Sequence, residues 1–157
     1  MKQYPVQFKV NGKSREVLVT ADETLLDTLR NQLEVFEVKN GCEQGDCGAC
    51  TVLINGKVVN ACLTLTVQIS GKEVTTIKGI GTDEKPHPLQ KSFHKHGASQ
   101  CGFCTPGMIT SSKALLDENP NPDIDEIKKG ISGNFCRCTG YTKILDAIES
   151  VANENQS

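Results

Sequence analysis

The sequence predicts an α+β protein, with a small β-sheet and one helix in its N-terminal half and a bundle of four helices in its C-terminal half. Two Asn-Gly pairs, at 11–12 and 55–56, each join two short extended runs, which is the pattern of tight β-hairpins. A stretch rich in glycine, proline and charge, 79–88, follows the last extended run, and apolar residues beyond it recur at helical spacing. We therefore expect two domains, 1–78 and 79–157.

The N-terminal half is expected to fold as a β-grasp domain. Asp22, Glu23 and Thr24 supply capping groups for a short helix whose leucines share one face. The predicted elements are strands at 4–10, 15–20, 51–54, 57–60 and 73–77 and a helix at 25–31. Hairpin, helix, loop, hairpin and final strand, in this order, describe a β-grasp fold.

The loop between the helix and the second hairpin carries Cys42, Cys47 and Cys50 in the spacing C-x4-C-x2-C. A fourth cysteine, Cys62, directly follows the hairpin, which returns it to the side of the loop. This is the plant-type ferredoxin spacing for a 2Fe-2S cluster. Glycines fill the gaps, and they tolerate positive φ angles and let backbone N–H groups approach the sulfurs. The four cysteines are therefore candidate ligands of a first cluster in a ferredoxin-like domain.

Four amphipathic helices are expected after the linker. Their predicted starts are Leu89, the Thr105-Pro106 pair with Thr105 as N-cap, Asp123, and the residues after Thr139, while Gly97 and Pro120 end the first two. Because short connections join these helices, their apolar faces are expected to pack together as a small bundle. Residues 153–157 are expected to form a frayed polar tail.

Two further cysteine pairs each stand immediately before a predicted helix. Cys101 and Cys104 have C-x2-C spacing, and Cys136 and Cys138 have C-x-C spacing. A dianionic cluster is favoured at a helix N-terminus, because unpaired N–H groups and the positive end of the helix dipole point at it. Two such termini at one end of the bundle predict a second 2Fe-2S cluster bound by these four cysteines.

Zinc is an alternative for the second set, because C-x2-C with C-x-C also supplies four thiolates to a tetrahedral site. The sequence begins without a charged segment followed by an apolar run, so no secretory signal is expected. Reduced thiolates in the cytoplasm are therefore favoured over a disulfide framework. His87, His94 and His96 have no partner at ligand spacing, and we expect them to be surface or packing residues.

The composition argues against several classes of function. No apolar run approaches the length of a membrane span, so no membrane partner is expected. The formal net charge is -2, and each oxidised cluster with four thiolates would add about -2, which together with the lack of a basic stripe opposes nucleic-acid binding. No catalytic triad, phosphate loop or nucleotide fingerprint is present. We therefore expect the chain to carry electrons and to perform no bond chemistry alone.

Three segments carry a resemblance to a known family. They are GCEQGDCGAC at 41–50, QCGFCTPG at 100–107 and GNFCRCTGY at 133–141. In this order they resemble the small iron-sulfur subunit of molybdenum hydroxylases, the xanthine dehydrogenase and aldehyde oxidoreductase family. The resemblance extends from about Val6 to Val151, and all eight cysteines match ligand positions. It implies one 2Fe-2S cluster in a β-grasp domain and a second in a four-helix domain.

The resemblance also implies partner subunits. The helical-domain cluster would lie nearer a molybdopterin-molybdenum cofactor in a large subunit, and Gln100 and Cys138 match positions that contact the pterin. The β-grasp cluster would face an FAD-binding subunit. Electrons would then pass from substrate to molybdenum, through both clusters, to FAD and an acceptor such as NAD(P). We expect separate subunits to supply the molybdenum and flavin sites.

The leading hypothesis is an electron-transfer subunit of a hetero-oligomeric molybdenum hydroxylase whose substrate is an N-heteroaromatic compound such as nicotinate or a purine. Aldehydes, carbon monoxide and aromatic acyl-CoA thioesters are alternative substrates, because the atoms that select the substrate belong to the molybdenum subunit. A free-standing double-cluster ferredoxin is a second hypothesis, although a simple carrier needs only the first domain. A zinc-stabilised interaction module is a third, and it predicts a colourless protein.

Overall fold

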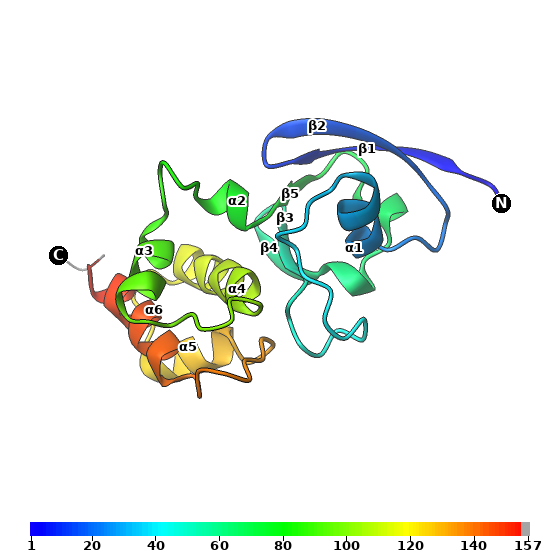
Figure 1. The fold of residues 1–157 in the computed structure, drawn as a ribbon. Coiled ribbons are helices and arrows are strands. Elements are labelled where there is room, and N and C mark those ends of the chain that lie inside the picture. The colour runs from blue at the N-terminus through cyan, green and yellow to red at the C-terminus, as the bar shows by residue number, and fades with distance from the viewer. Residues whose placement is uncertain (155–157) are drawn as a thin grey trace.

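The computed structural model describes residues 1–154, and it places a β-sheet with α1 on one side of the molecule and the longer helices on the other (Figure 1). The strands are β1 (Tyr4–Val10), β2 (Lys13–Val19), β3 (Thr51–Ile54), β4 (Lys57–Asn60) and β5 (Glu73–Thr75). The helices are α1 (Leu25–Asp27), α2 (Ile77–Ile80), α3 (Pro88–Lys95), α4 (Thr105–Glu118), α5 (Ile124–Gly130) and α6 (Thr142–Glu154). A π-helical turn at Thr28–Gln32 continues α1, and 3-10 turns lie at Ala61–Leu63 and Thr66–Ile69.

The five strands form one mixed sheet in the order β2-β1-β5-β3-β4. β1 pairs antiparallel with β2 and parallel with β5, and β3 pairs antiparallel with β4 and β5. Alternate residues of β1, Val6, Phe8 and Val10, are buried in one core with Leu25 and Leu29 of the neighbouring helical segment. The first and last strands are thus neighbours inside the sheet, and the predicted β-grasp fold is confirmed.

Both predicted hairpins form around their Asn-Gly pairs. Asn11 and Gly12 have φ angles of 50° and 78°, and Asn55 and Gly56 have φ angles of 49° and 81°. Two successive positive φ angles are typical of the tight turn that matches strand twist, and asparagine and glycine adopt them most easily. Asn11 also ties its turn to the end of β5, since its Oδ1 accepts the N–H of Thr76 at 2.8 Å.

The elements of the N-terminal half differ from the predicted ones mainly at their ends. β2 begins at Lys13, earlier than expected, because its pairing with β1 continues up to the turn. β5 is shorter than expected, and α2 occupies Ile77–Ile80, where the sequence predicted the end of a strand and the start of a linker. The strand ends because the N–H of Thr76 bonds to the Asn11 side chain instead of to a neighbouring strand.

In the C-terminal half, α3 packs against α4 and α6, and α5 also packs against α4 and α6. Their shared core contains Leu89, Phe93, Met108, Ile127, Ile144 and Ile148, all of them buried. His87 caps α3, since its Nδ1 accepts the N–H of Leu89 at 3.2 Å while Gln90 Oε1 accepts the N–H of His87 at 2.7 Å. The helical periodicity of the sequence therefore corresponds to real helices. Only the connection between α4 and α5 is short, whereas the segments 96–104 and 131–141, which hold the cysteine pairs, are longer than expected.

Two helix starts in this half differ from expectation. Cys104, and not Thr105, is the N-cap of α4. α6 begins at Thr142 instead of directly after Thr139, because the preceding Gly140 and Tyr141 have left-handed φ angles of 63° and 70° that no right-handed helix contains. α6 continues through residue 154, so the first two residues of the predicted polar tail are helical, and 155–157 lie outside the described residues.

The two halves meet where α4 packs against β3 and β4 (Figure 1). This contact places the first turn of α4, directly after Cys104, beside the loop that precedes β3. Within residues 1–154, no helix is both long and apolar enough to cross a membrane.

Candidate metal centres

The first four cysteines gather around the loop before β3. Cys42 and Cys47 are partly exposed on this loop, whereas Cys50 and Cys62 keep only 2% and 7% of their surface exposed. The β3-β4 hairpin brings the last two together, and the N–H of Ala61 donates to the carbonyl oxygen of Cys50 at 3.3 Å. The hairpin therefore returns the distal cysteine to the loop, as its position in the sequence leads one to expect.

Backbone N–H groups point at the sulfurs of this loop. Cys42 Sγ accepts from the N–H groups of Gln44 and Cys47, each at 3.4 Å, and Cys47 Sγ accepts from the N–H of Ala49 at 3.5 Å. The donors of Cys47 and Gln44 lower the pKa of the Cys42 thiol to about 6. Burial has the opposite effect at Cys50, where it raises the pKa of the thiol to about 12. The thiolate form of Cys50 therefore needs a nearby cation to stabilise it in this buried position. A bound metal ion provides this, because it deprotonates a coordinating thiol.

The second four cysteines gather between the start of α4 and the segment before α6. Cys101 and Cys138 are exposed, and their sulfurs lie 3.6 Å apart. Cys104 and Cys136 are partly buried beneath them, and burial, with the neighbouring Cys136 thiol, raises the pKa of Cys104 to about 12. The Cys101 and Cys104 pair thus stands at a helix N-terminus as predicted. The Cys136 and Cys138 pair does not, because the left-handed turn at Tyr141 separates it from α6.

The spacing of the sulfurs distinguishes between kinds of site. Two thiolates bound at about 2.3 Å to one tetrahedral metal lie about 3.8 Å apart, which fits the 3.6 Å between the sulfurs of Cys101 and Cys138. A disulfide needs about 2.05 Å, and all eight cysteines are free. The other thiols also interact within each set: Cys42 with Cys47, Cys50 with both Cys62 and Cys47, and Cys104 with both Cys136 and Cys101.

The arrangement of the donors also bears on zinc. A single zinc ion needs three or four donors around one point, and the part of the chain that the structure describes holds no group of three or more such side chains arranged for one ion. In a two-iron cluster with four cysteine ligands, bridging sulfides complete each iron, so the protein supplies its sulfurs two by two. The 3.6 Å between the sulfurs of Cys101 and Cys138 fits two ligands of one iron in such a cluster.

A buried junction connects the two candidate centres. Asn134, 5% exposed, donates its amide to the carbonyl oxygen of Gly48 at 3.1 Å and accepts the hydroxyl of Ser111 at 2.7 Å. The approach is close, because a Cβ atom on Gly107 would lie 2.2 Å from the same Gly48 oxygen. The next residue, Phe135, donates its N–H to the carbonyl oxygen of Cys47 at 2.9 Å. Sequence reasoning missed Asn134, and its place in the GNFC segment was the available signal.

Gln100 and Cys138, the residues matched to pterin contacts, are both exposed. Gln100 directly precedes Cys101, whose sulfur lies 3.6 Å from that of Cys138. The structure therefore places both residues at one exposed edge of the second centre.

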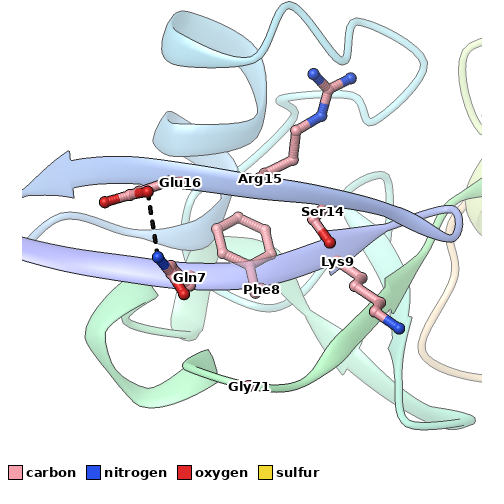
Figure 2. A pocket seen from close by; sticks show the side chains of 7 residues that line it. All are labelled: Gln7, Phe8, Lys9, Ser14, Arg15, Glu16 and Gly71. Carbon is pink, nitrogen blue, oxygen red and sulfur yellow. Dashed lines mark hydrogen bonds between the residues drawn. The ribbon is translucent and has the colours of Figure 1, made fainter.

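A cavity of about 420 Å³ lies elsewhere, along the β1-β2 hairpin (Figure 2). It is lined by Gln7, Phe8, Lys9, Ser14, Arg15, Glu16 and Gly71. The Gln7 amide donates to Glu16 across the two strands at 3.1 Å. No cysteine lines this cavity, so it is separate from both candidate centres.

Comparison with known families agrees with the arrangement of the site. Residues 8–75 match the model of a 2Fe-2S iron-sulfur cluster binding domain, and residues 76–149 match the model of a second [2Fe-2S] binding domain. The chain is therefore an iron-sulfur protein with two 2Fe-2S-binding domains, and it carries two clusters.

Similar proteins define the family more closely. The aldehyde oxidoreductase iron-sulfur-binding subunit of Escherichia coli K12 is 47% identical over 98% of this chain and 73% of its own length. The nicotinate dehydrogenase small FeS subunit of Eubacterium barkeri is 45% identical over 94% of each chain. In the structure of quinoline 2-oxidoreductase from Pseudomonas putida 86, a chain that is 44% identical superposes with a TM-score of 0.93 and covers 99% of this chain and 98% of its own. This chain belongs to the small iron-sulfur subunits of the molybdenum hydroxylase family, and it is an electron-transfer subunit of an oxidoreductase.

Proposed function

We propose that Cys42, Cys47, Cys50 and Cys62 bind one 2Fe-2S cluster and that Cys101, Cys104, Cys136 and Cys138 bind the other. The gathering of each set supports this assignment, and the 3.6 Å between the sulfurs of Cys101 and Cys138 supports a shared iron for these two. In the second cluster, Cys101 and Cys138 share one iron, and Cys104 and Cys136 share the other. Each cluster supplies a site that takes up and releases one electron at a time.

Exposure supports one order of the two centres along the electron route. The second centre has two exposed cysteines, Cys101 and Cys138, next to the exposed Gln100. We assign this edge to the partner subunit that holds the molybdopterin-molybdenum cofactor, with Gln100 and the Cys138 sulfur as contacts of the pterin. The first centre passes electrons to an FAD-binding subunit. The hydrogen bond between the Cys47 carbonyl and Phe135 supports a direct passage between the two centres.

The division into domains is part of the same proposal. We assign 1–78 to the β-grasp domain and 79–157 to the helical domain, whose helices α3–α6 act as a four-helix bundle with the second centre at one end. The mutual packing of these four helices supports the bundle. A location in the cytoplasm stays a prediction, which rests on the use of reduced cysteines as metal ligands.

We assign an N-heteroaromatic substrate to the whole complex. The relatives that act on such compounds by name, nicotinate dehydrogenase and nicotine 6-hydroxylase, are 45% and 46% identical to this chain. An aldehyde is the second candidate, because an aldehyde oxidoreductase subunit is 47% identical. In this proposal the molybdenum subunit holds the substrate, so the choice between the two substrates belongs to that subunit.

The test is anaerobic reduction of the complex purified from its own host, followed by the visible absorption of the clusters. We expect nicotinate or a related N-heteroaromatic compound to bleach the absorption within one turnover. Bleaching by aldehydes alone would overturn the substrate assignment and leave the electron route intact. Bleaching by dithionite without bleaching by any substrate, in a protein that purifies without large subunits, would instead indicate a free-standing ferredoxin.

A further inference from the structure

The sulfur of Cys136 receives a hydroxyl donor, unlike the sulfurs of Cys42 and Cys47. The hydroxyl of Thr139 donates to Cys136 Sγ at 3.1 Å, and the N–H of Thr139 lies 3.4 Å from the same sulfur. The sulfurs of Cys42 and Cys47 receive backbone N–H groups instead. A side-chain donor can be removed by a single substitution, whereas a backbone donor cannot.

The direction of the Thr139 hydroxyl is fixed by its neighbours. The N–H of Tyr141 donates to Thr139 Oγ1 at 3.2 Å, so this oxygen already accepts one bond and its own proton is left for the sulfur. Tyr141 reaches this position through its left-handed φ of 70°, a conformation that is costly for a residue with a side chain. The hydroxyl oxygen of Tyr141 in turn accepts the N–H of Cys136 at 2.9 Å. The three residues therefore hold one another in place.

We propose that Thr139 sets the reduction potential of the second cluster through its hydrogen bond to Cys136. This inference rests on the proposed function, because it requires a cluster at Cys136. Reduction adds one electron to the cluster, one ferric ion becomes ferrous, and no bond forms or breaks. The net charge of the cluster with its thiolates changes from about -2 to about -3, so a donor at the sulfur stabilises the reduced form more than the oxidised form. Thr139 therefore raises the potential of this cluster.

The chain offers a matched control. Thr105 also directly follows a cysteine of the second centre and is also partly buried, but its hydroxyl pairs with that of Ser99 at 2.9 Å and not with a sulfur. Thr139→Val and Thr105→Val are thus the same chemical change, each removing one threonine hydroxyl beside the second cluster. Only the first substitution removes a hydrogen bond to the cluster.

The experiment measures the potentials of both clusters in the purified complex by electron paramagnetic resonance, while a chemical reductant and mediators set the solution potential. We expect Thr139→Val to lower the reduced-to-oxidised ratio of one cluster several-fold at its wild-type midpoint, and a tenfold change corresponds to about 59 mV for a one-electron couple. The other cluster keeps its potential. Thr139→Ser retains the hydroxyl, and Thr105→Val removes one that does not contact a sulfur. In both variants we expect the reduced-to-oxidised ratio of each cluster, at its wild-type midpoint, to stay within twofold of the wild-type value.

An unchanged potential in Thr139→Val, or an equal shift in Thr105→Val, would overturn the inference. Loss of the second cluster from both Thr139→Val and Thr139→Ala would also overturn it, because Thr139 would then be needed for assembly instead of for the potential. A wild-type protein with only one cluster would overturn the proposed function and this inference together. Two intact clusters with unchanged potentials would overturn this inference alone.

Discussion

The carbonyl oxygen of Cys47 accepts the backbone N–H of Phe135 at 2.9 Å, and this one bond joins the two cysteine groups. Phe135 is the residue before Cys136, so the path from a candidate ligand of the first cluster to one of the second crosses a single hydrogen bond. The buried side chain of Asn134 stabilises this junction through its hydrogen bonds to Gly48 and Ser111. The distance between the two centres is therefore set by buried contacts and not by a flexible linker.

Replacing Asn134 with alanine tests the junction. The substitution leaves the Ser111 hydroxyl without its partner in a buried site, which costs about 1–3 kcal/mol. It also removes one donor from the Gly48 carbonyl, which keeps the hydroxyl and the N–H of Thr51. We expect a lower midpoint of urea unfolding and slower electron transfer between the clusters, measured by rapid reduction kinetics. The exposed Asn121 provides the control, since Asn121→Ala should change stability by no more than about 0.5 kcal/mol. Equal effects of the two substitutions would contradict a role for Asn134 at the junction.

Gly107 tests how closely the halves approach. A Cβ atom at this position would meet the Gly48 carbonyl oxygen at 2.2 Å, and backbone atoms cannot move aside easily. We expect Gly107→Ala to destabilise the protein by about 1–3 kcal/mol, as overpacking commonly does, in a denaturant titration. Gly133→Ala is the matched control, because nothing lies within 4 Å of its Cβ position. A stability of Gly107→Ala equal to that of the control would show that the two halves are not in this contact.

The cysteines of the apo protein should differ in reactivity. The N–H donors of Cys47 and Gln44 lower the pKa of Cys42 to about 6, and burial raises the pKa of Cys50 to about 12. At pH 7 we expect iodoacetamide to modify Cys42 at least tenfold faster than Cys50, as read by mass spectrometry of peptides. Faster modification of Cys50 would contradict this arrangement of the loop.

The same shift predicts a pH dependence of the stability of the apo protein. The folded pKa of Cys42 lies below that of the unfolded chain, so its contribution is fully present above the unfolded pKa, near 9. The contribution should fall as pH decreases from about 9 towards 6. Urea midpoints of the apo wild type and of apo Cys42→Ser across this range measure it, and the variant should lack this part of the dependence. An identical dependence in both proteins would show that Cys42 is not its source.

The pterin-facing edge makes a separate prediction. Cys138→Ser should weaken the second cluster and slow or abolish substrate-driven reduction, because an alcohol is a poor iron ligand beside three thiolates. Gln100→Ala should keep all the iron yet slow reduction, since it removes a proposed contact to the pterin and no ligand. Gln3→Ala, at an exposed glutamine of the N-terminal segment, is the control. Unchanged kinetics in Cys138→Ser, or loss of iron from Gln100→Ala, would contradict these roles.

Much of the fold could be predicted because it depends on local signals. The Asn-Gly pairs determine both hairpins, and the spacing of apolar residues determines α3–α6. The first cysteine set is local in the same sense, since three of its members share one loop and Cys62 follows the hairpin that returns to that loop. These features need no knowledge of how distant segments approach.

The parts that escaped prediction depend on such approaches. Asn134 bonds to Gly48, 86 positions away, and although the GNFC segment marks Asn134, nothing in it identifies Gly48 as the partner. The start of α6 depends on the left-handed Tyr141, whose conformation is held by bonds to Thr139 and Cys136. α2 begins directly after Thr76, whose N–H donates to the side chain of Asn11, 65 positions earlier. In each case a tertiary contact overrides the local preference.

The measurement that tests the central claim most directly is the metal content of the purified chain in its complex, with the electron paramagnetic resonance spectrum of the reduced protein. Two 2Fe-2S clusters predict four iron atoms and four acid-labile sulfides per chain, with two distinguishable one-electron signals. One or two zinc ions per chain and no labile sulfide, in a colourless protein, would contradict it.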